Sequence, residues 1–311
     1  MGIIRGGDAE YDDSKPSIED KTEKIEQLIR AALEKDPSSL KMCGKYFGAD
    51  EVEIISGSEQ METVRSLDLS DNQITDEALV VLFKSSRLSK LESLHLGINF
   101  ITDVGVQAVS ELPDCSVKEL RSLILSDNKI TDASGAKLMR SPNFSGLESL
   151  DLGWNEIGNG TLQALGEPDA MKKLKKLELE RSYIDESGIQ GMLEGEGVKT
   201  LEELNLSANK LTDAAIQKLA GAAKLSNLKV LRISQNQIGD EGAKSLGEST
   251  CLSGLTHLYM GRNSFGPEGA KAVYESQTLK NLKTLMLKEG VETTPDLVNF
   301  SRPELLRPED P

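Results

Sequence analysis

Apolar residues recur along this chain inside one phrase, Leu-x-x-Leu-x-Leu-x-x-Asn-x-Ile. Its first intact copy reads Val64, Leu67, Leu69, Asn72 and Ile74. The asparagine position then recurs every 27 residues, as from Asn72 to Asn99, apart from one step of 29. The residues at that position are Asn99, Asn128, Asn155, Ser182, Asn209, Asn236, Asn263 and Gly290. A constant period in this range is typical of a solenoid, in which each unit packs only on its neighbours.

The two halves of each repeat have different periods. Alternation such as Leu67-x-Leu69 predicts a short strand with one buried face. After the asparagine, a Thr-Asp or Gly-Asp pair predicts the start of a helix. These pairs are Thr75-Asp76, Thr102-Asp103, Thr131-Asp132, Thr212-Asp213 and Gly239-Asp240. A small residue four positions after the Ile, and a large apolar residue four further on, share one helix face. We expect the small residues to let the helix approach the strand closely.

Each repeat is therefore predicted to form strand, turn, helix and turn, which gives an α/β fold. Parallel strands stack on one side of the solenoid and helices on the other. Helices are about 10 Å wide, whereas strands lie about 4.8 Å apart, so the stack must bend with its strands inside. This geometry predicts a horseshoe with a concave sheet and convex helices.

The pattern divides the chain into four segments. Residues 1–16 are rich in Gly and Asp and are predicted to be a disordered tail. Residues 17–59 are predicted to form an N-terminal cap, with a helix after Ser17 and a degenerate repeat. In that repeat Leu40, Met42 and Phe47 occupy the apolar positions and Lys45 replaces the asparagine. Residues 60–290 are predicted to form the solenoid and residues 291–311 a C-terminal tail.

Charge and cysteine content narrow the function classes. The net charge is −15, so binding to nucleic acid, which needs a basic footprint, is not expected. We find no apolar run long enough to span a bilayer, and no membrane partner is expected. Cys43, Cys115 and Cys251 are an odd, widely spaced set, which favours a reducing compartment. The chain is accordingly expected to be cytoplasmic and monomeric.

The segment LRSLILSDNKITDASGAKL at 120–138, with its equivalents, resembles the leucine-rich repeat family, and in particular its ribonuclease-inhibitor-like subclass. The resemblance implies that the asparagines bind main-chain groups of neighbouring turns, and are structural. It also implies a non-enzymatic scaffold for protein–protein interaction. Narrower functions in this family are inhibition of a basic enzyme, activation of a GTPase with Arg65 or Arg121 as candidates, actin capping as in tropomodulin, and recognition by a microbial effector or surveillance receptor.

Candidate partner-binding residues follow from the variable positions of the strand segment, which are predicted to face the concave side. One column is the middle strand position and the other is the position just before the asparagine. Trp, Tyr and Arg are frequent hot-spot residues of interfaces. Flat packing of Trp154 over the sheet, without a binding role, is the competing interpretation. The candidates from both columns are Asp68, His95, Asp151, Trp154, Glu178, Arg181, Arg232, Tyr259 and Arg262.

The same columns predict a charge gradient. Acidic residues such as Asp68 and Asp151 dominate the first four repeats, and basic residues such as Arg232 and Arg262 dominate the last three. We therefore expect a protein partner with basic and acidic patches, docked in one orientation. Chance scatter of charges on a solvated face is the alternative.

Catalysis has little support in the sequence. His95 and His257 lie six repeats apart, about 29 Å at the spacing of strands, and cannot share a metal or a proton. No spacing typical of zinc ligands and no phosphate-binding or nucleophile motif occurs. We expect no catalytic residue, no metal and no cofactor.

Overall fold

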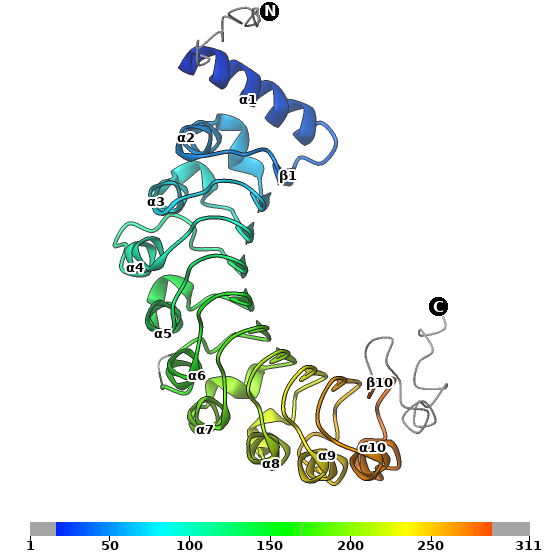
Figure 1. The fold of residues 1–311 in the computed structure, drawn as a ribbon. Helices are drawn as coiled ribbons and strands as arrows, with labels where there is room; N and C mark the ends of the chain where they lie inside the picture. The colour runs from blue at the N-terminus through cyan, green and yellow to red at the C-terminus, as the bar shows by residue number, and fades with distance from the viewer. Residues whose placement is uncertain (1–16, 169, 288–311) are drawn as a thin grey trace, which may run out of the picture.

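The computed structural model describes residues 17–168 and 170–287, which form an arc with strands on its inner side and helices on its outer side (Figure 1). The strands pair in parallel in the order of the sequence and form one open sheet. They are β1 (Ser39–Lys41), β2 (Ser66–Asp68), β3 (Ser93–His95), β4 (Ser122–Ile124), β5 (Ser149–Asp151), β6 (Lys176–Glu178), β7 (Glu203–Asn205), β8 (Val230–Arg232), β9 (His257–Tyr259) and β10 (Thr284–Met286). The predicted α/β leucine-rich repeat solenoid is confirmed.

The register of the sheet follows the repeat phrase. Leu67 lies opposite Leu40 on one side and Leu94 on the other. The step of 29 residues leaves this register unchanged, because Leu94 lies opposite Leu123. The longer step is taken up between α4, which ends at Ser110, and β4. The solenoid therefore accommodates insertions in its helix-to-strand connections and keeps the strands aligned.

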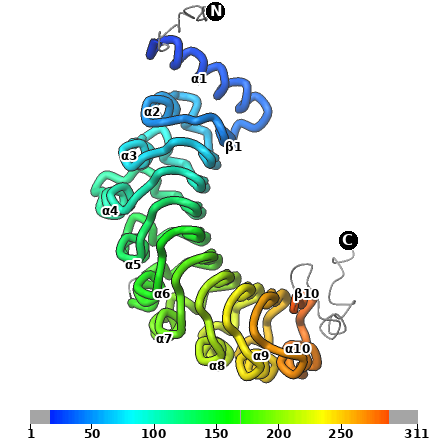
Figure 2. Tube along the Cα trace, in the orientation of Figure 1, coloured from blue at the N-terminus to red at the C-terminus, as the bar shows by residue number. Residues whose placement is uncertain are grey.

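The helices follow the strand-to-helix turns and form the outer layer (Figure 2). They are α1 (Ile18–Leu33), α2 (Ala49–Gly57), α3 (Asp76–Lys84), α4 (Asp103–Ser110), α5 (Asp132–Arg140), α6 (Asn159–Leu165), α7 (Glu186–Glu194), α8 (Asp213–Ala220), α9 (Asp240–Gly247) and α10 (Pro267–Tyr274). Short 3₁₀ helices lie in several return connections: η1 (Glu59–Thr63), η2 (Ser86–Leu88), η3 (Pro142–Phe144), η4 (Gly197–Thr200) and η5 (Ala223–Leu225). Leu67, Leu69, Ile74 and Leu82, with their equivalents, fill one continuous core between the layers.

Neighbouring helices are joined at their N-termini by acidic side chains. Asp76, the first residue of α3, accepts hydrogen bonds from the Thr102 backbone N–H at 2.7 Å and hydroxyl at 2.6 Å. Asp103 binds Thr131 in the same way, at 2.8 and 2.7 Å. Asp240 accepts the backbone N–H of Gly266 at 2.7 Å. Each aspartate thus binds the turn of the following repeat, where backbone N–H groups have no partner inside their own helix.

The small residues on the helix face have a different reason from the one the sequence suggested. A Cβ added to Gly242 would lie 2.6 Å from Oδ1 of Asp213, and one added to Gly105 would lie 2.5 Å from Oδ1 of Asp76. Alanine occupies this position where the preceding helix starts without such an acid, as at Ala215 after Glu186. The glycines therefore make room for the aspartate of the preceding helix, and approach between helix and strand is not what requires them.

The N-terminal end of the solenoid is covered by α1, α2 and β1. Ser17 and Asp20 form a reciprocal capping box at the start of α1, as the sequence predicted. Ile25 and Ile29 of α1 are buried in the common core. The degenerate repeat also contains α2, a helix that the sequence pattern did not predict. The tails predicted at 1–16 and 291–311, and the Gly290 position, lie outside the described residues.

Candidate functional site

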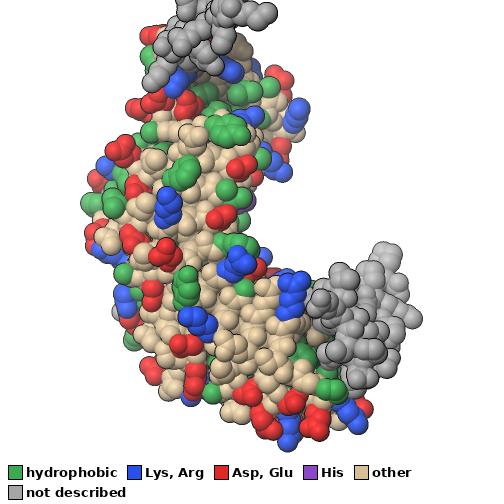
Figure 3. All heavy atoms as spheres, in the orientation of Figure 1, with side chains coloured by type: hydrophobic (Ala, Val, Ile, Leu, Met, Phe, Trp, Pro, Cys, Tyr) green, Lys and Arg blue, Asp and Glu red, His purple; other side chains and the backbone are tan. Residues whose placement is uncertain are grey.

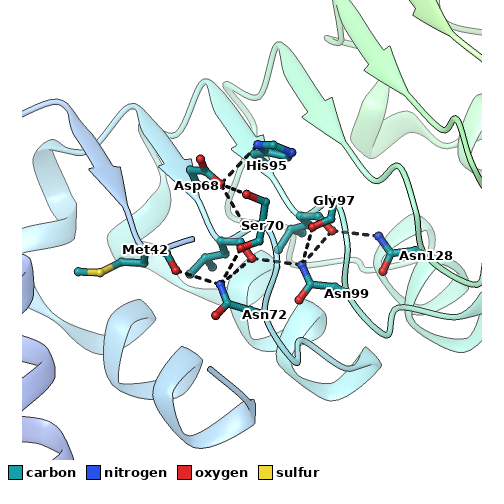
Figure 4. Close-up of polar contacts among 10 residues, drawn as sticks. Met42, Asp68, Ser70, Asn72, His95, Gly97, Asn99 and Asn128 are labelled. Atoms are coloured by element: carbon teal, nitrogen blue, oxygen red, sulfur yellow. Dashed lines mark hydrogen bonds and ion pairs between the residues drawn. The ribbon is translucent and has the colours of Figure 1, made fainter. Parts of the chain in front are cut away.

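Every turn between strand and helix contains a buried asparagine that binds its own turn and both neighbours (Figure 4). The Asn72 amide nitrogen donates to the carbonyl oxygens of Met42 at 2.9 Å, Leu69 at 3.0 Å and Ser70 at 3.1 Å. Its Oδ1 accepts the backbone N–H groups of Lys45 and Phe47, both at 3.0 Å. The same pattern of donation recurs at Asn99, Asn128, Asn155, Asn209, Asn236 and Asn263. We call this set the asparagine ladder.

Ser182 interrupts the asparagine ladder. Its hydroxyl is buried and has no hydrogen-bond partner among the described residues. Serine is too short to reach the groups that Asn155 and Asn209 bind on either side. The repeat between β6 and α7 therefore lacks the connection to its neighbours that the other turns share.

The residue just before each asparagine has an unusual backbone. At this position φ lies between 52° and 58° in eight successive repeats, from Asp71 to Arg262. This left-handed region is costly for residues other than Gly, Asn and Asp, and most of all for a β-branched residue such as Ile98. The strands end three residues earlier, so Trp154, Arg181 and Arg262 belong to the turns and not to the strand segment, where the sequence reading had placed them. We call this edge of the horseshoe the turn edge.

The middle strand position places charged side chains side by side on the sheet. Asp68 lies opposite His95, with 3.4 Å between its Oδ1 and the histidine Nδ1 (Figure 4). Asp151 lies opposite Glu178 in the next pair of strands. Burial raises the pKa of Asp151, and the negative charge of Glu178 raises it further. Two carboxylates therefore share a site in which the ionised form of Asp151 is disfavoured.

Arg232 lies two strands beyond Glu178 at the basic end of the same face. Its guanidinium is 5.1 Å from the centre of the Tyr259 ring, a cation–π distance. Its Nη1 is 3.8 Å from Glu203 and 4.0 Å from Glu178, too far for a hydrogen bond. That buried nitrogen has no hydrogen-bond partner among the described residues. Arg232 thus keeps an unused donor on the concave face.

Ion pairs between neighbouring repeats reduce the charge contrast along the concave face. Arg65 pairs with Glu92, and Glu148 pairs with Arg121 at 3.0 Å and with Lys175 at 2.7 Å. Hydrogen bonds from Lys175 and then from Arg121 hold the pKa of Glu148 below its usual range. Several charges that contributed to the predicted gradient are therefore paired within the protein.

The turn edge carries most of the exposed large hydrophobic side chains, which the sequence did not single out. Five of the seven such residues in the described chain lie there: Tyr46, Ile98, Phe100, Trp154 and Tyr183. Cations cover three of the rings. Arg181 lies 4.1 Å from the centre of the Trp154 ring, Lys129 lies 5.4 Å from that of Phe100, and Lys210 lies 5.1 Å from that of Tyr183. A period of 27 residues in exposed aromatic and basic positions was the available signal.

Groups that could support chemistry are sparse. All three cysteines are free; Cys43 is exposed, and burial raises the pKa of the Cys115 thiol. Within residues 17–168 and 170–287 no cluster of His, Cys, Asp and Glu could hold a metal ion. In the same residues no helix is both long and apolar enough to cross a membrane.

Comparisons with known proteins agree with the repeat geometry. A family model described as Leucine Rich repeat matches residues 60–83, 87–110, 119–139, 147–166, 199–220, 224–247 and 254–273. The unit left without a match, between 166 and 199, is the one that contains Ser182. The comparison with curated proteins found no match.

Solved structures give weaker similarities. An internalin (inlF) from Listeria monocytogenes is 23% identical, with a TM-score of 0.44 over 88% of this chain and 92% of that one. A TDR receptor is 15% identical, with a TM-score of 0.43 over 81% of this chain and 43% of that one. The matched repeats, the parallel sheet and the asparagine ladder together identify the chain as a leucine-rich repeat protein.

Proposed function

We propose that this protein is a non-enzymatic scaffold that binds a protein partner on its concave face. The observation that carries the proposal is the unused donor of Arg232, which is buried beside Tyr259 without a hydrogen bond. A buried donor without a partner costs free energy, about 1–3 kcal/mol for a typical group. An acceptor on a bound protein would complete its hydrogen bonding.

The acidic end of the face supports the same proposal. Asp151 and Glu178 oppose each other on neighbouring strands, and the pKa of Asp151 is raised by burial and by that neighbour. A lysine or arginine from a partner would relieve this repulsion. In Figure 1 no described helix lies on the inner side of the sheet, so the face is open to a partner. A partner with a basic patch near Asp151 and an acidic patch near Arg232 fits this arrangement.

The finer features of the proposal rest on the repeat itself. A period of 27 residues with an α-helix in each unit favours the ribonuclease-inhibitor-like subclass. We also propose that residues 17–59 act as the cap of the solenoid at 60–290, and that the protein is a cytoplasmic monomer. Inhibition of a basic enzyme is a narrower version of this function, supported by the Asp151–Glu178 pair. Regulation of a GTPase through Arg65 or Arg121 is not favoured, since both are engaged in ion pairs.

Affinity capture with charge reversal tests the concave face. The full chain is immobilised and exposed to lysate of its source at low salt, beside the double variant Asp68→Lys, Arg232→Glu. The control is Glu241→Lys, Lys244→Glu on the exposed side of α9, which also leaves the net charge unchanged. We expect the concave variant to lose proteins that the wild type and the control retain. Recovery of the same proteins by all three would overturn concave-face binding.

A further inference from the structure

The turn edge contains a groove that differs from the concave face in location and chemistry. It has a volume of about 390 Å³ and is lined by the side chains of three repeats and the cap. Its apolar walls are Tyr46, Ile98 and Phe100, which are 79%, 54% and 50% exposed. Asp71 and Asp127 flank them. Large hydrophobic side chains are thus held in solvent around a cavity with room for a partner's side chains.

The backbone indicates that these side chains are not present for stability. Ile98 has a φ of 58°, where a β-branched residue is an outlier. Asn or Gly would adopt this conformation at lower cost, and Ile98 gains little burial in exchange. Strain held at an exposed position is typical of binding surfaces. The corresponding turns of the last repeats carry Ala208 and Gln235, and no exposed large hydrophobic residue lies in residues 208–287.

Figure 3 shows the contrast between the two ends of this edge. Hydrophobic side chains and cations are spread over the repeats from the N-terminal end to the middle of the arc. Over the repeats of α8 to α10 the same face consists mainly of backbone and uncharged polar side chains. The exposed apolar residues are therefore confined to one half of an edge whose backbone is the same throughout.

The charges around the groove define its occupant. Neither Asp71 nor Asp127 has an ion-pair partner within 4.0 Å among the described residues, whereas Lys129 is engaged over the Phe100 ring. Two available carboxylates thus flank an apolar cavity. We propose that this groove binds a protein segment in which an apolar side chain is flanked by lysine or arginine. The apolar side chain enters between Ile98 and Phe100, and the basic groups meet Asp71 and Asp127.

Fluorescence anisotropy with three labelled synthetic peptides tests this proposal on the full chain. The probe contains Lys-Leu-Phe-Lys, and the two reference peptides replace either the charges, as Glu-Leu-Phe-Glu, or the apolar pair, as Lys-Ser-Ser-Lys. We expect the probe to bind about tenfold more tightly than either reference peptide, and its affinity to fall with added salt. Equal binding of all three peptides, or binding of none, would overturn the proposal.

Substitutions in two turns separate binding from stability. Ile98→Asn should weaken probe binding by about tenfold or more and raise the Tm by about 2 °C, because Asn tolerates the left-handed backbone. The matched control is Gln235→Asn, at the same position of a turn without apolar neighbours, where φ is 56°. It should leave probe binding unchanged. Unchanged binding in Ile98→Asn would refute the groove, whatever happens to its Tm.

Two further measurements close the remaining routes. Asp127→Lys should weaken binding of the probe without changing binding of Lys-Ser-Ser-Lys by the same factor; equal loss for both would mean general charge attraction and would overturn the proposal. Sedimentation of the wild type identifies self-association. A dimer that Ile98→Asn abolishes would show that the groove holds a second copy of this chain, and would overturn the occupant proposed here. Because none of these variants touches Arg232 or Asp151, failure of the groove leaves the concave-face proposal to be judged separately.

Discussion

Two adjacent columns in the same turns behave in opposite ways. The asparagine ladder is buried, binds three or more backbone groups per residue, and keeps the same residue type in almost every repeat. The column just before it is exposed, keeps the same left-handed backbone, and varies from Asp to Ile, Trp and Arg. The comparison teaches that a common backbone conformation does not require a common residue. Residue type is constrained where a side chain satisfies buried polar groups, and it is free to serve binding where the side chain reaches solvent.

The largest expected effect breaks the buried column. Asn155 donates to the carbonyl oxygens of Leu125 and Leu152 and accepts the backbone N–H of Ile130 at 3.1 Å. Asn155→Ala leaves these groups without that partner and should lower the free energy of unfolding by about 3 kcal/mol in urea titration. The control is Asn227→Ala, because Asn227 is exposed and binds one carbonyl oxygen, that of Lys199. Similar losses for both variants would contradict a special role for the ladder.

The second prediction tests whether the acids between helices impose a comparable constraint. Gly242→Ala places a Cβ 2.6 Å from Oδ1 of Asp213, and should cost about 2 kcal/mol although alanine favours helix. Adding Asp213→Ala removes the clash, so the double variant should lose less than the sum of the two single losses. Additive losses in this thermodynamic cycle would show that the glycine has another role.

The third prediction repairs the interruption in the buried column. Ser182→Asn would restore a side chain long enough to reach the positions that Asn155 and Asn209 bind in their turns. It should raise the free energy of unfolding by about 1 kcal/mol, the net value of one or two hydrogen bonds. A loss of stability in the same urea titration would mean that this turn differs from its neighbours in more than its side chain.

The smallest effect concerns the concave face and depends on pH. Since the pKa of Asp151 is raised in the folded protein, its stabilising contribution is present below the unfolded value of about 3.9 and is lost as the pH rises through the folded value. Asp151→Asn removes the charge and should raise stability at pH 7 by about 1 kcal/mol or less. The gain should shrink in acid, as unfolding curves at several pH values would show. A variant that is less stable than the wild type at pH 7 would exclude a cost at this site.

Much of the fold could be predicted because the repeat phrase is read against simple spacing. Leu67, Leu69 and Ile74 face one core since strand and helix periods leave no other arrangement, and the register Leu67 to Leu94 follows from the constant period. The helix α2 was missed because its repeat is degenerate. The role of Gly242 was misread because its neighbour, Asp213, lies in the preceding repeat and not in its own.

The candidate site was predictable only in part. The strand column of Asp68, Asp151 and Arg232 follows from alternation, and its binding role stays a prediction. Trp154 and Arg181 were assigned to the same strip, yet the left-handed turn moves them out of the strand. Backbone sign of φ has no signature in the residue types of this column, because they range from Asp71 to Ile98 and Arg262.

The sequence by itself determined the period, the layers of the solenoid and the residues of its core, since these depend on spacing that every repeat restates. Only the tertiary structure decided which side chains of neighbouring repeats meet. The Asp151–Glu178 pair, the unused donor of Arg232 and the groove around Ile98 each form across repeats, from residues about 27 or more positions apart in the chain. Function in such a protein is a property of stacking, because a single repeat contributes one residue to each of these sites and cannot form any of them alone.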